Sequence, residues 1–364
     1  MTILIVLGSI GLILTLVISC SPQFGGSVGK AEREQYQDFP NYNSDKKIFE
    51  NLTETSMDMN FKSIWSLLKD YIKGDSTRSP ARDIATLPYH EFEADTVPKI
   101  MWFGHSSFLL QMNGKNILID PMLSEVPSPY DFLGQPRYSQ SLPSEIEELP
   151  QIDYVIISHD HYDHLDYKTI KALKSKTQHF LVPYGVSVHL KRWEIEAERI
   201  HELNWWDEQE MEGIKFAFTP SRHFSGRGLF DRFETLWGGW VIQSPNYNLY
   251  FSGDGGYGDH FKEIGEKYGP FDFTMIECGQ YDERWNQIHM MPEESAQACV
   301  DLKTKTAMPV HWAAFTLALH SWTDPVERFS AKAQELELDY ITPEIGEKVR
   351  IGLDHPTGRW WDKH

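Results

Sequence analysis

The sequence predicts an α/β protein in which polar loops follow buried strands. Apolar, β-branched runs of strand length recur along the chain, and several end directly in a histidine or an aspartate. Segments with apolar residues at helical spacing lie between them. The 364 residues, 41% of them hydrophobic and 13% aromatic, are enough for one large globular domain or two ordinary ones.

The densest group of polar side chains is Ser158–His164, which contains three histidines and two aspartates. It follows Tyr154–Ile157, a run with the length and β-branched content of a buried strand. Imidazole binds zinc, iron, copper and nickel, and carboxylate joins it at zinc or iron. Four such ligands within six residues do not easily reach one tetrahedral ion, so two adjacent ions fit better. The alternative is a solvated, histidine-rich turn.

The formal net charge of −19 limits the partners that the chain can bind. A strongly acidic protein repels a phosphate backbone, so the charge argues against a nuclease and predicts no nucleic-acid partner. A small molecule or a lipid is the expected substrate.

Residues 1–20 resemble a bacterial signal peptide. Ile3–Ile18 is almost wholly apolar and uncharged, but shorter than the roughly 20 residues that a spanning helix needs. Leu16–Cys20 resembles a lipobox, which predicts an extracytoplasmic protein anchored to a membrane through a lipidated Cys20. Met1 and Thr2 lack the usual positive charge, so an uncleaved membrane anchor and a core segment are alternatives.

Residues 21–88 are predicted to be a tether and a helical extension. Ser21–Ser27 has the composition of a flexible tether. Phe61–Ile72 has the apolar spacing of an amphipathic helix, which would either pack on the domain or lie on a membrane and gather substrate. The main domain is expected at 89–354, followed by a tail at 355–364. Within that domain, Cys278 and Cys299 are expected to be buried thiols, with a disulfide as the alternative.

Several further strands in the main domain lead to isolated polar residues. Ile100–Leu110 and Asn116–Asp120 are predicted to pair as a hairpin around Asn113 and Gly114. A helix is expected at Tyr167–Lys174. Strand-like runs then precede single polar residues, namely Ile214–Thr219 before His223, Leu249–Ser252 before Asp254, and Ala307–Val310 before His311. Each of these histidines, taken alone, would more often be structural than a ligand.

The spacing His159-x-His161-x-Asp163-His164 resembles the metal motif of the metallo-β-lactamase-fold hydrolases. The resemblance extends over residues 90–350. It implies an αββα four-layer sandwich of two mixed β-sheets, with helices outside and the metals at one edge.

The resemblance also implies a set of metal ligands. One ion would be held by His159, His161 and His223, a second by Asp163, His164 and His311, and Asp254 would bridge them. Two Zn²⁺ ions are the default, with iron or manganese as alternatives, because all the ligand atoms are nitrogen or oxygen. Two close ions lower the pKa of a shared water and so provide hydroxide at neutral pH. The departing group would take its proton from metal-bound water or from Asp163, which would then be catalytic.

Two residues of the predicted hairpin are candidates for supporting these ligands. Asp120 lies where the family keeps a carboxylate near the metals, and it would either orient a ligand histidine or cap the strand end. His105 would either support a ligand in a similar way or be an ordinary buried histidine.

Four further stretches resemble the branch that contains N-acylphosphatidylethanolamine-hydrolysing phospholipase D. They are Trp102–Phe108, Ile117–Ser124, Leu236–Trp240 and His289–Ser295. The branch places a histidine beside the metals just before its Pro-Glu-Glu helix, which implies that His289 is catalytic and donates to a substrate phosphate oxygen. A capping or solvent-exposed histidine is the alternative. Arg222 and Arg227 are candidates for phosphate contacts, or for ordinary ion pairs.

The leading functional hypothesis is a membrane-tethered, two-metal phosphodiesterase that acts on a phospholipid-like substrate, as a phospholipase D does. A lactonase of the sugar-phosphate lactonase type on the same fold is the alternative. A non-catalytic metal-binding lipoprotein is a third hypothesis. The large ligand set argues against it, because structural zinc sites usually close four ligands around one ion.

Overall fold

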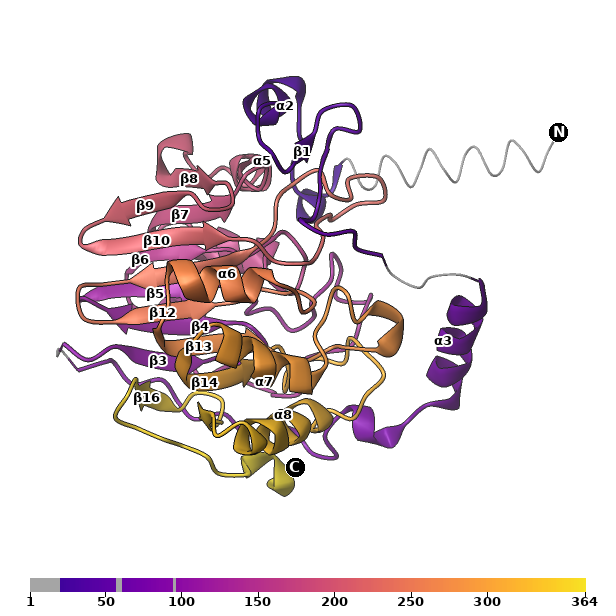
Figure 1. Ribbon diagram of the computed structural model, residues 1–364, viewed down its shortest axis with the longest axis vertical. Coiled ribbons are helices and arrows are strands. Elements are labelled where there is room, and N and C mark those ends of the chain that lie inside the picture. Colours follow the sequence, from indigo (N-terminus) through magenta and orange to yellow (C-terminus); the bar gives the residue numbers. More distant parts are fainter. Residues whose placement is uncertain (1–19, 57–60, 94–95) are drawn as a thin grey trace.

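The computed structural model describes residues 20–56, 61–93 and 96–364. Within them, two seven-stranded sheets pack face to face and helices cover both outer faces (Figure 1). This is the αββα sandwich that the sequence predicts. The predicted signal segment that precedes Cys20 lies outside the described residues.

The first sheet is antiparallel at one end and parallel at the other. Its strand order is β16-β3-β4-β5-β6-β7-β8, and β5 to β8 run parallel to one another. The strands are β3 (Lys99–Trp102), β4 (Phe108–Met112), β5 (Lys115–Ile119), β6 (Ile152–Ile156), β7 (Thr177–Pro183), β8 (Ile200–Leu203) and β16 (Lys348–Arg350).

The second sheet is mixed in the same way. Its order is β15-β14-β13-β12-β11-β10-β9, with parallel pairing from β12 to β15. The strands are β9 (Glu208–Met211), β10 (Ile214–Thr219), β11 (Gly239–Gln243), β12 (Asn248–Phe251), β13 (Phe271–Glu277), β14 (Thr304–Val310) and β15 (Asp339–Tyr340). A separate two-stranded ribbon pairs β1 (Tyr42–Asn43) with β2 (Ile48–Phe49).

Helices separate both sheets from solvent. Apolar residues of α4 (Tyr167–Leu173) and α5 (Ser187–Arg192) pack on the first sheet, and those of α6 (His260–Lys267), α7 (Pro292–Asp301) and α8 (Asp324–Glu335) pack on the second. The remaining helices are α2 (Lys30–Tyr36), α3 (Phe61–Lys73) and the short 3₁₀ turns η1 (Pro22–Phe24), η2 (Ser76–Arg78), η3 (Ile146–Glu148), η4 (Ala197–Arg199), η5 (Glu283–Trp285) and η6 (Trp360–Lys363). The predicted helices at 61–72 and 167–174 are therefore confirmed.

The predicted hairpin is present, but its first arm is broken. Asn113 and Gly114 both have positive φ, 53° and 74°, as a two-residue type I′ turn between β4 and β5 requires. The stretch expected as one strand, Ile100–Leu110, forms parts of two strands, β3 and β4. The chain turns between these strands because Gly104 and His105 adopt positive φ values of 87° and 53°. This turn is what brings His105 to the end of the sheet.

The segments at the two ends of the main domain pack on it more closely than their composition predicts. Residues 21–28 are not a loose tether. The indole of Trp193 donates to the Pro22 carbonyl, and side chains at Gly25 or Gly26 would collide with His189 or Val188. The predicted tail at 355–364 contains Trp360 and Trp361, which are buried in the core between the sheets.

The cysteines and the helices are the subject of two further expectations. Cys278 and Cys299 are both free and buried, as expected. Among residues 20–56, 61–93 and 96–364, no helix has the length and apolar character that crossing a membrane requires.

Candidate metal centre

The polar residues predicted from the sequence converge at one edge of the sandwich, where strands of both sheets end. The loop after β6 carries His159–His164, and the segments after β10, β12 and β14 carry His223, Asp254 and His311. The carboxyl ends of parallel strands meet at the same edge of a sheet, which explains why residues so distant in sequence meet here. Gly253, at φ 59°, is needed in this place because a side chain there would collide with the Gly238 carbonyl and with Ser158.

One group of ligand atoms comes from His159, His161 and His223, whose ligand atoms all lie within 4.8 Å of one another. His159 Nε2 is 2.8 Å from His161 Nδ1, and His223 Nε2 is 3.3 Å from the same atom. The other nitrogen of His223 donates to the Ile288 carbonyl at 2.8 Å, which leaves Nε2 for a metal.

A second group contains Asp163, His164 and His311, and His105 joins it. Asp163 Oδ2 lies 2.8 Å from His105 Nε2 and 3.5 Å from His164 Nε2. His105 is buried, and its ring centroid is 4.0 Å from that of His311. It therefore has the contacts of a residue that holds Asp163 in place, which is the supporting role considered from the sequence.

Asp254 lies between the two groups. Its Oδ2 is 3.1 Å from His164 Nε2 and 3.9 Å from both His159 Nε2 and His223 Nε2, while its Oδ1 is 3.2 Å from His311 Nδ1. One carboxylate thus faces histidines of both groups, as a bridging ligand must.

The unsatisfied atoms of the cluster fit bound cations. His164 Nε2 and Asp254 Oδ1 are buried and have no hydrogen-bond partner in the protein. Buried polar atoms seldom lack a partner, since leaving one unsatisfied costs about 1–3 kcal/mol. Nitrogen and oxygen donors converging in this way match the ligands that zinc, iron and manganese take.

Asp120 supports the cluster from behind. It is fully buried, its Oδ2 lies 2.7 Å from His164 Nδ1, and its Oδ1 accepts from the Ser158 backbone at 2.7 Å. A carboxylate in this position fixes the tautomer of the histidine and makes its other nitrogen more basic. The same contacts hold the end of β6, so Asp120 both orients a ligand and caps the strand end.

Burial and charge set the protonation of the cluster. Burial holds the pKa values of His159, His223 and His311 well below their ordinary value, so these imidazoles are neutral and able to bind metal at neutral pH. Burial alone would raise the pKa of Asp254, but His164 and His311 hold it well below the usual range. The ionised Asp254 suits a cation. Burial would lower the pKa of His164, but the charges of Asp254 and Asp163 raise it well above its ordinary value, so a metal ion would displace a proton from that imidazole.

The role of Asp163 as a proton donor does not fit its surroundings. Burial would raise its pKa, but His164 and His105 outweigh burial and hold the pKa well below its ordinary value. A carboxyl group that stays ionised can bind a metal but has no proton to give near neutral pH.

His289 lies at the rim of the cluster and has a buried partner that the sequence analysis missed. Its ring centroid is 5.1 Å from that of His223 and 5.4 Å from that of His311. Its Nδ1 is 2.9 Å from Oε1 of Glu277, whose other oxygen accepts from the Met290 backbone at 3.1 Å. Glu277 is fully buried at the end of β13. The signal that could have revealed it is a charged residue inside an apolar strand.

The pKa values of both members of this pair are shifted upward. Burial raises the pKa of Glu277 to about 7. Burial acts to lower the pKa of His289, but the hydrogen bond and the charge of Glu277 outweigh it and raise that pKa above its ordinary value.

The two candidate arginines are not brought into the cluster. Arg227 is buried, and its guanidinium donates to the carbonyls of Asp160, Leu165 and Gln23. Arg222 donates to the Glu54 and Tyr257 carbonyls and to the Thr55 hydroxyl. Their donors tie the site loops to the N-terminal segment, which argues against phosphate contacts by either residue.

The comparisons with known proteins agree with this architecture. The family described as "Beta-lactamase superfamily domain" matches residues 115–312. The chain is 36% identical over 352 residues to a protein of Mycobacterium tuberculosis that is named only as uncharacterized, and the match covers 94% of this chain and 92% of the relative. It is 30% identical over 285 residues to N-acyl-phosphatidylethanolamine-hydrolyzing phospholipase D 1 of Caenorhabditis elegans, covering 72% and 80%.

Solved structures show the same fold. The metallo hydrolase Igni18 of Ignicoccus hospitalis superimposes with a TM-score of 0.52 at 23% identity, over 70% of this chain and 98% of that chain. The chain therefore belongs to the metallo-β-lactamase superfamily and is a metal-dependent hydrolase.

Proposed function

We propose that this protein is a two-zinc phosphodiesterase that hydrolyses a phospholipid-like substrate. The observation that carries the proposal is the position of His289, held at the rim of the histidine and aspartate cluster by the buried Glu277. The likeness to the phospholipase D of C. elegans supports the substrate class.

A phosphodiester explains why a further donor belongs at this rim. It is negatively charged before the reaction and gains charge in the transition state, whereas a lactone carbonyl starts neutral. The Nδ1 atom of His289 is taken by Glu277, so Nε2 is the atom left to donate to a phosphate oxygen. A donor placed where charge develops stabilises the transition state more than the ground state.

The other roles in the proposed reaction are metal binding, orientation of the ligands and donation of a proton, and each falls to different residues. Two ions held by the seven proposed ligands (His159, His161, Asp163, His164, His223, Asp254 and His311) would lower the pKa of water and so supply a nucleophile at neutral pH. Asp120 and His105 keep His164 and Asp163 oriented. His289, with its raised pKa, is better suited than Asp163 to donate a proton to the departing group.

The test compares two substrate classes in one variant. His289→Ala should lower kcat/KM for a phosphodiester by about 10²- to 10³-fold, the usual size for the loss of one such donor. Zinc content should be unchanged, and hydrolysis of a lactone, if present, should fall much less. His201→Ala is the matched control, because His201 lies in β8 at the edge of the first sheet.

Two results would contradict the proposal. Equal losses on both substrates would remove the reason for assigning a phosphodiester. Loss of zinc from His289→Ala would show that His289 binds or directly supports a metal.

We also propose that Cys20 is the membrane anchor. The lipobox-like sequence before it supports this, and Cys20 itself is exposed. Cys20→Ser should release the protein from the membrane fraction or leave an uncleaved precursor. Unchanged mass and fractionation would show instead that the N-terminal apolar segment holds the protein.

A further inference from the structure

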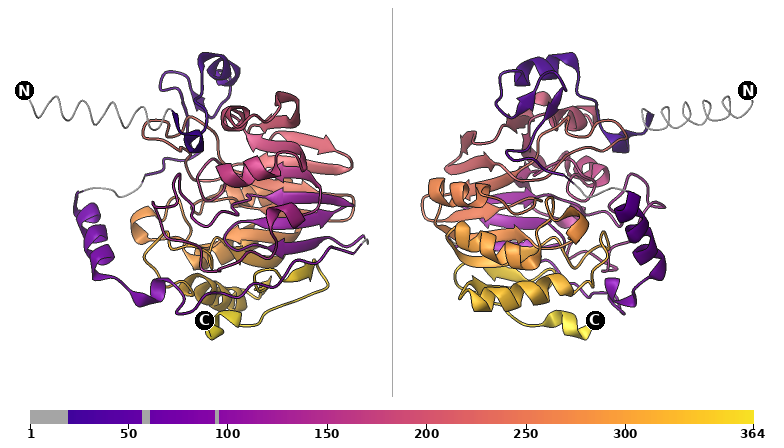
Figure 2. Two further views of the ribbon diagram at one scale, coloured as in Figure 1. Left: turned by 180° about the vertical axis from the view of Figure 1, so that it is seen from behind. Right: turned by 45° about the vertical axis from the view of Figure 1, so that its right-hand side comes forward.

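Helix α3 presents large apolar side chains to solvent. Figures 1 and 2 show it apart from the two sheets, at the edge of the molecule. Its exposed apolar residues are between 44% and 74% accessible, and they are Ile64, Trp65, Leu68, Tyr71 and Ile72. Their helical spacing places them on one continuous side of α3. An apolar side that remains exposed marks a surface that binds something else.

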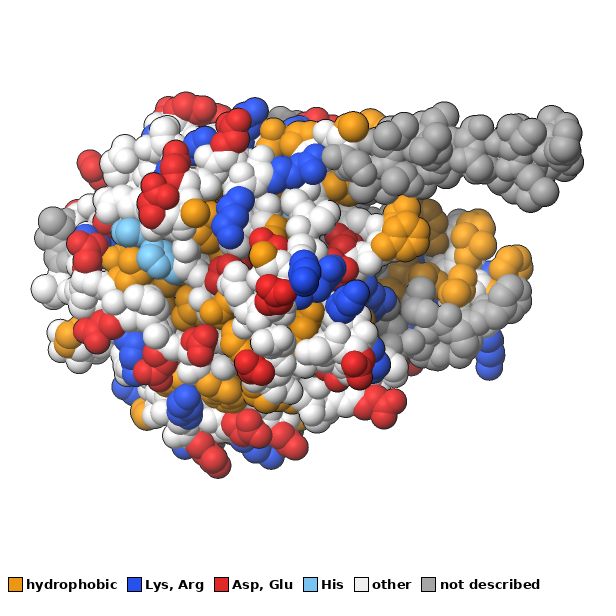
Figure 3. Space-filling model, turned by 90° about the horizontal axis from the view of Figure 1, so that it is seen from above, with side chains coloured by type: hydrophobic (Ala, Val, Ile, Leu, Met, Phe, Trp, Pro, Cys, Tyr) orange, Lys and Arg blue, Asp and Glu red, His pale blue; other side chains and the backbone are white. Residues whose placement is uncertain are grey.

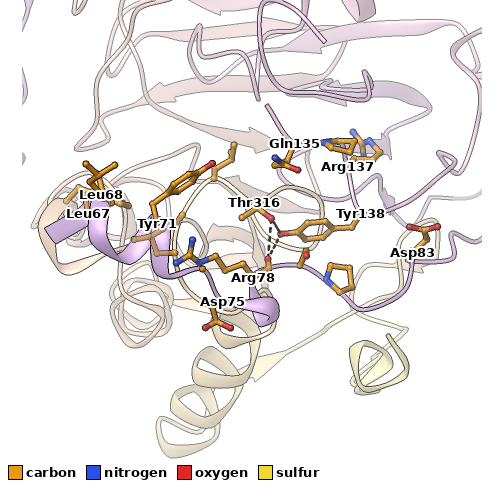
Figure 4. Close-up of a pocket in the computed structure, with 18 of the residues that line it drawn as sticks. Leu67, Leu68, Tyr71, Asp75, Arg78, Asp83, Gln135, Arg137, Tyr138 and Thr316 are labelled. Atoms are coloured by element: carbon orange, nitrogen blue, oxygen red, sulfur yellow. Dashed lines mark hydrogen bonds between the residues drawn. The ribbon is translucent and has the colours of Figure 1, made fainter. Parts of the chain in front are cut away.

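The side of α3 that faces the body does not close onto it. A cavity of about 950 Å³ lies between them, and Leu67, Leu68 and Tyr71 line it from the helix. Figure 4 shows these residues across from Tyr138 and Thr316, with the hydroxyl of Tyr138 hydrogen-bonded to Thr316 and to the Arg78 backbone. Trp65 and Ile72 do not line this cavity, so their apolar side chains remain exposed to solvent.

The charges on α3 are the reverse of those on the chain as a whole. Lys62, Lys69 and Lys73 are exposed, whereas the one acidic residue, Asp70, is paired with Arg284 at 3.0 Å. Figure 3 shows hydrophobic side chains gathered at this edge of the molecule. The chain carries a net charge of −19, so a helix with lysines beside an apolar side is an exception that attracts an anionic surface.

The cavity behind α3 is next to segments that carry site histidines. Thr316 and Leu317, in the loop that follows His311, line it, and so does Trp285 in the turn before His289. A surface bound at α3 would thus lie beside two of the segments that build the metal centre.

We propose that α3 docks this protein on an anionic phospholipid bilayer, with Trp65 and Ile72, which do not line the cavity, among the acyl chains and its lysines at the head groups. A basic amphipathic helix that contains tryptophan binds membranes in this orientation. The proposal goes beyond the proposed function, because such docking does not depend on which bond the enzyme cleaves.

The test reads the environment of two positions on the same helix. A polarity-sensitive fluorophore is attached through Ile72→Cys, on the apolar side, or through Ser66→Cys, on the polar side. Both variants also carry Cys20→Ser, and the label spares Cys278 and Cys299 because they are buried. On vesicles of phosphatidylglycerol and phosphatidylcholine, the label at 72 should shift to the blue and the label at 66 should not.

The charge requirement is tested in the same assay. Replacing Lys62, Lys69 and Lys73 with glutamine should weaken the vesicle-dependent shift at position 72 roughly 100-fold in lipid concentration, since each lysine near an anionic surface contributes about a fivefold factor. Hydrolysis of a soluble phosphodiester should be unchanged, which separates failure of this proposal from failure of the proposed function. The N-terminal segment is common to all variants, so differences between them report on α3.

Three outcomes would overturn the proposal. Equal responses at 66 and 72, or no response at either, would show that the apolar side does not enter the bilayer. A shift at 72 that appears without vesicles and grows with protein concentration would show that a second copy of the chain covers α3.

Discussion

The carboxylate of Asp120 lies 2.7 Å from Nδ1 of His164, and both side chains are fully buried. This contact connects the end of β5 to the loop that follows β6. Because the two strands are neighbours in the sheet, the contact fixes the orientation of the His164 ring and so the direction of its Nε2 atom. His164 Nε2 is left facing Asp254 at 3.1 Å. This contact makes Asp120 the most informative supporting residue to change.

Asp120→Asn should weaken zinc binding about 10- to 100-fold, the usual effect of losing a carboxylate behind a ligand histidine. The amide keeps the size of the side chain but lacks the charge that makes His164 a better ligand. Competition with a zinc-binding dye would measure the change. Asp153→Asn is the matched control, because Asp153 also accepts a backbone N–H in the first sheet but does not contact the cluster. Equal zinc affinity in the Asp120 variant and the wild type would mean that Asp120 only caps the strand.

Glu277→Gln should move the alkaline limb of the pH profile of kcat/KM to lower pH. Glu277 raises the pKa of His289, so its carboxylate keeps His289 protonated to higher pH. A neutral amide removes that effect, and His289 then loses its proton earlier as the pH rises. Glu277→Asp should restore part of the shift. A profile that only drops in height, without moving, would assign Glu277 a purely structural role.

Trp361→Ala should lower the free energy of unfolding by about 3–5 kcal/mol, as removal of a buried tryptophan usually does. The ring is buried, and its centroid lies 5.6 Å from that of Trp312, the residue after His311. Urea unfolding would measure the loss. Lys363→Ala, in the same turn but exposed, should change stability by less than about 1 kcal/mol. Equal stability in both variants would show that residues 355–364 add nothing to the core and would support the expectation of a C-terminal tail outside the main domain.

His260 should make the fold less stable in mild acid. Burial lowers its pKa from 6.5 to about 3, so the unfolded chain binds a proton that the folded chain does not between those pH values. The contribution of neutral His260 to the free energy of unfolding is complete above pH 6.5 and is lost as the pH falls toward 3. The free energy of unfolding should therefore fall by about 2 kcal/mol between pH 7 and pH 5 because of this residue. His260→Phe should remove that part of the pH dependence. Urea unfolding at several pH values, with a chelator present so that metal loss does not contribute, would measure this. If the free energy of unfolding fell equally with pH in the variant and the wild type, His260 would not be the cause.

The strand-end residues could be predicted because each follows an apolar run and because their order along the chain resembles that of a known metal-binding family. His159–His164, His223, Asp254 and His311 follow apolar runs, and the two sheets bring those runs to one edge. Glu277 carries only the weaker signal of a charged residue in an apolar strand, and nothing in the sequence connects it with its partner His289, which lies across a turn.

Amino-acid composition gave wrong predictions for segments whose structure depends on contacts with residues distant in sequence. Ser21–Ser27 has the glycine and serine content of a tether, yet its backbone fits against α5. Arg222 and Arg227 have the charge for phosphate, but carbonyls distant in sequence take up their donors. The packing of 21–28 and the pairing of those arginines depend on residues that no local pattern connects.

The central claim is that two ions act together at one site, and a zinc titration tests it most directly. Protein stripped with a chelator should regain phosphodiesterase activity in proportion to added zinc, with the maximum at two equivalents per chain. Asp254→Ala, which removes the carboxylate between the two groups of histidines, should stay inactive at the same zinc content as long as its circular dichroism is unchanged. Full activity at one equivalent per chain would contradict the two-ion mechanism.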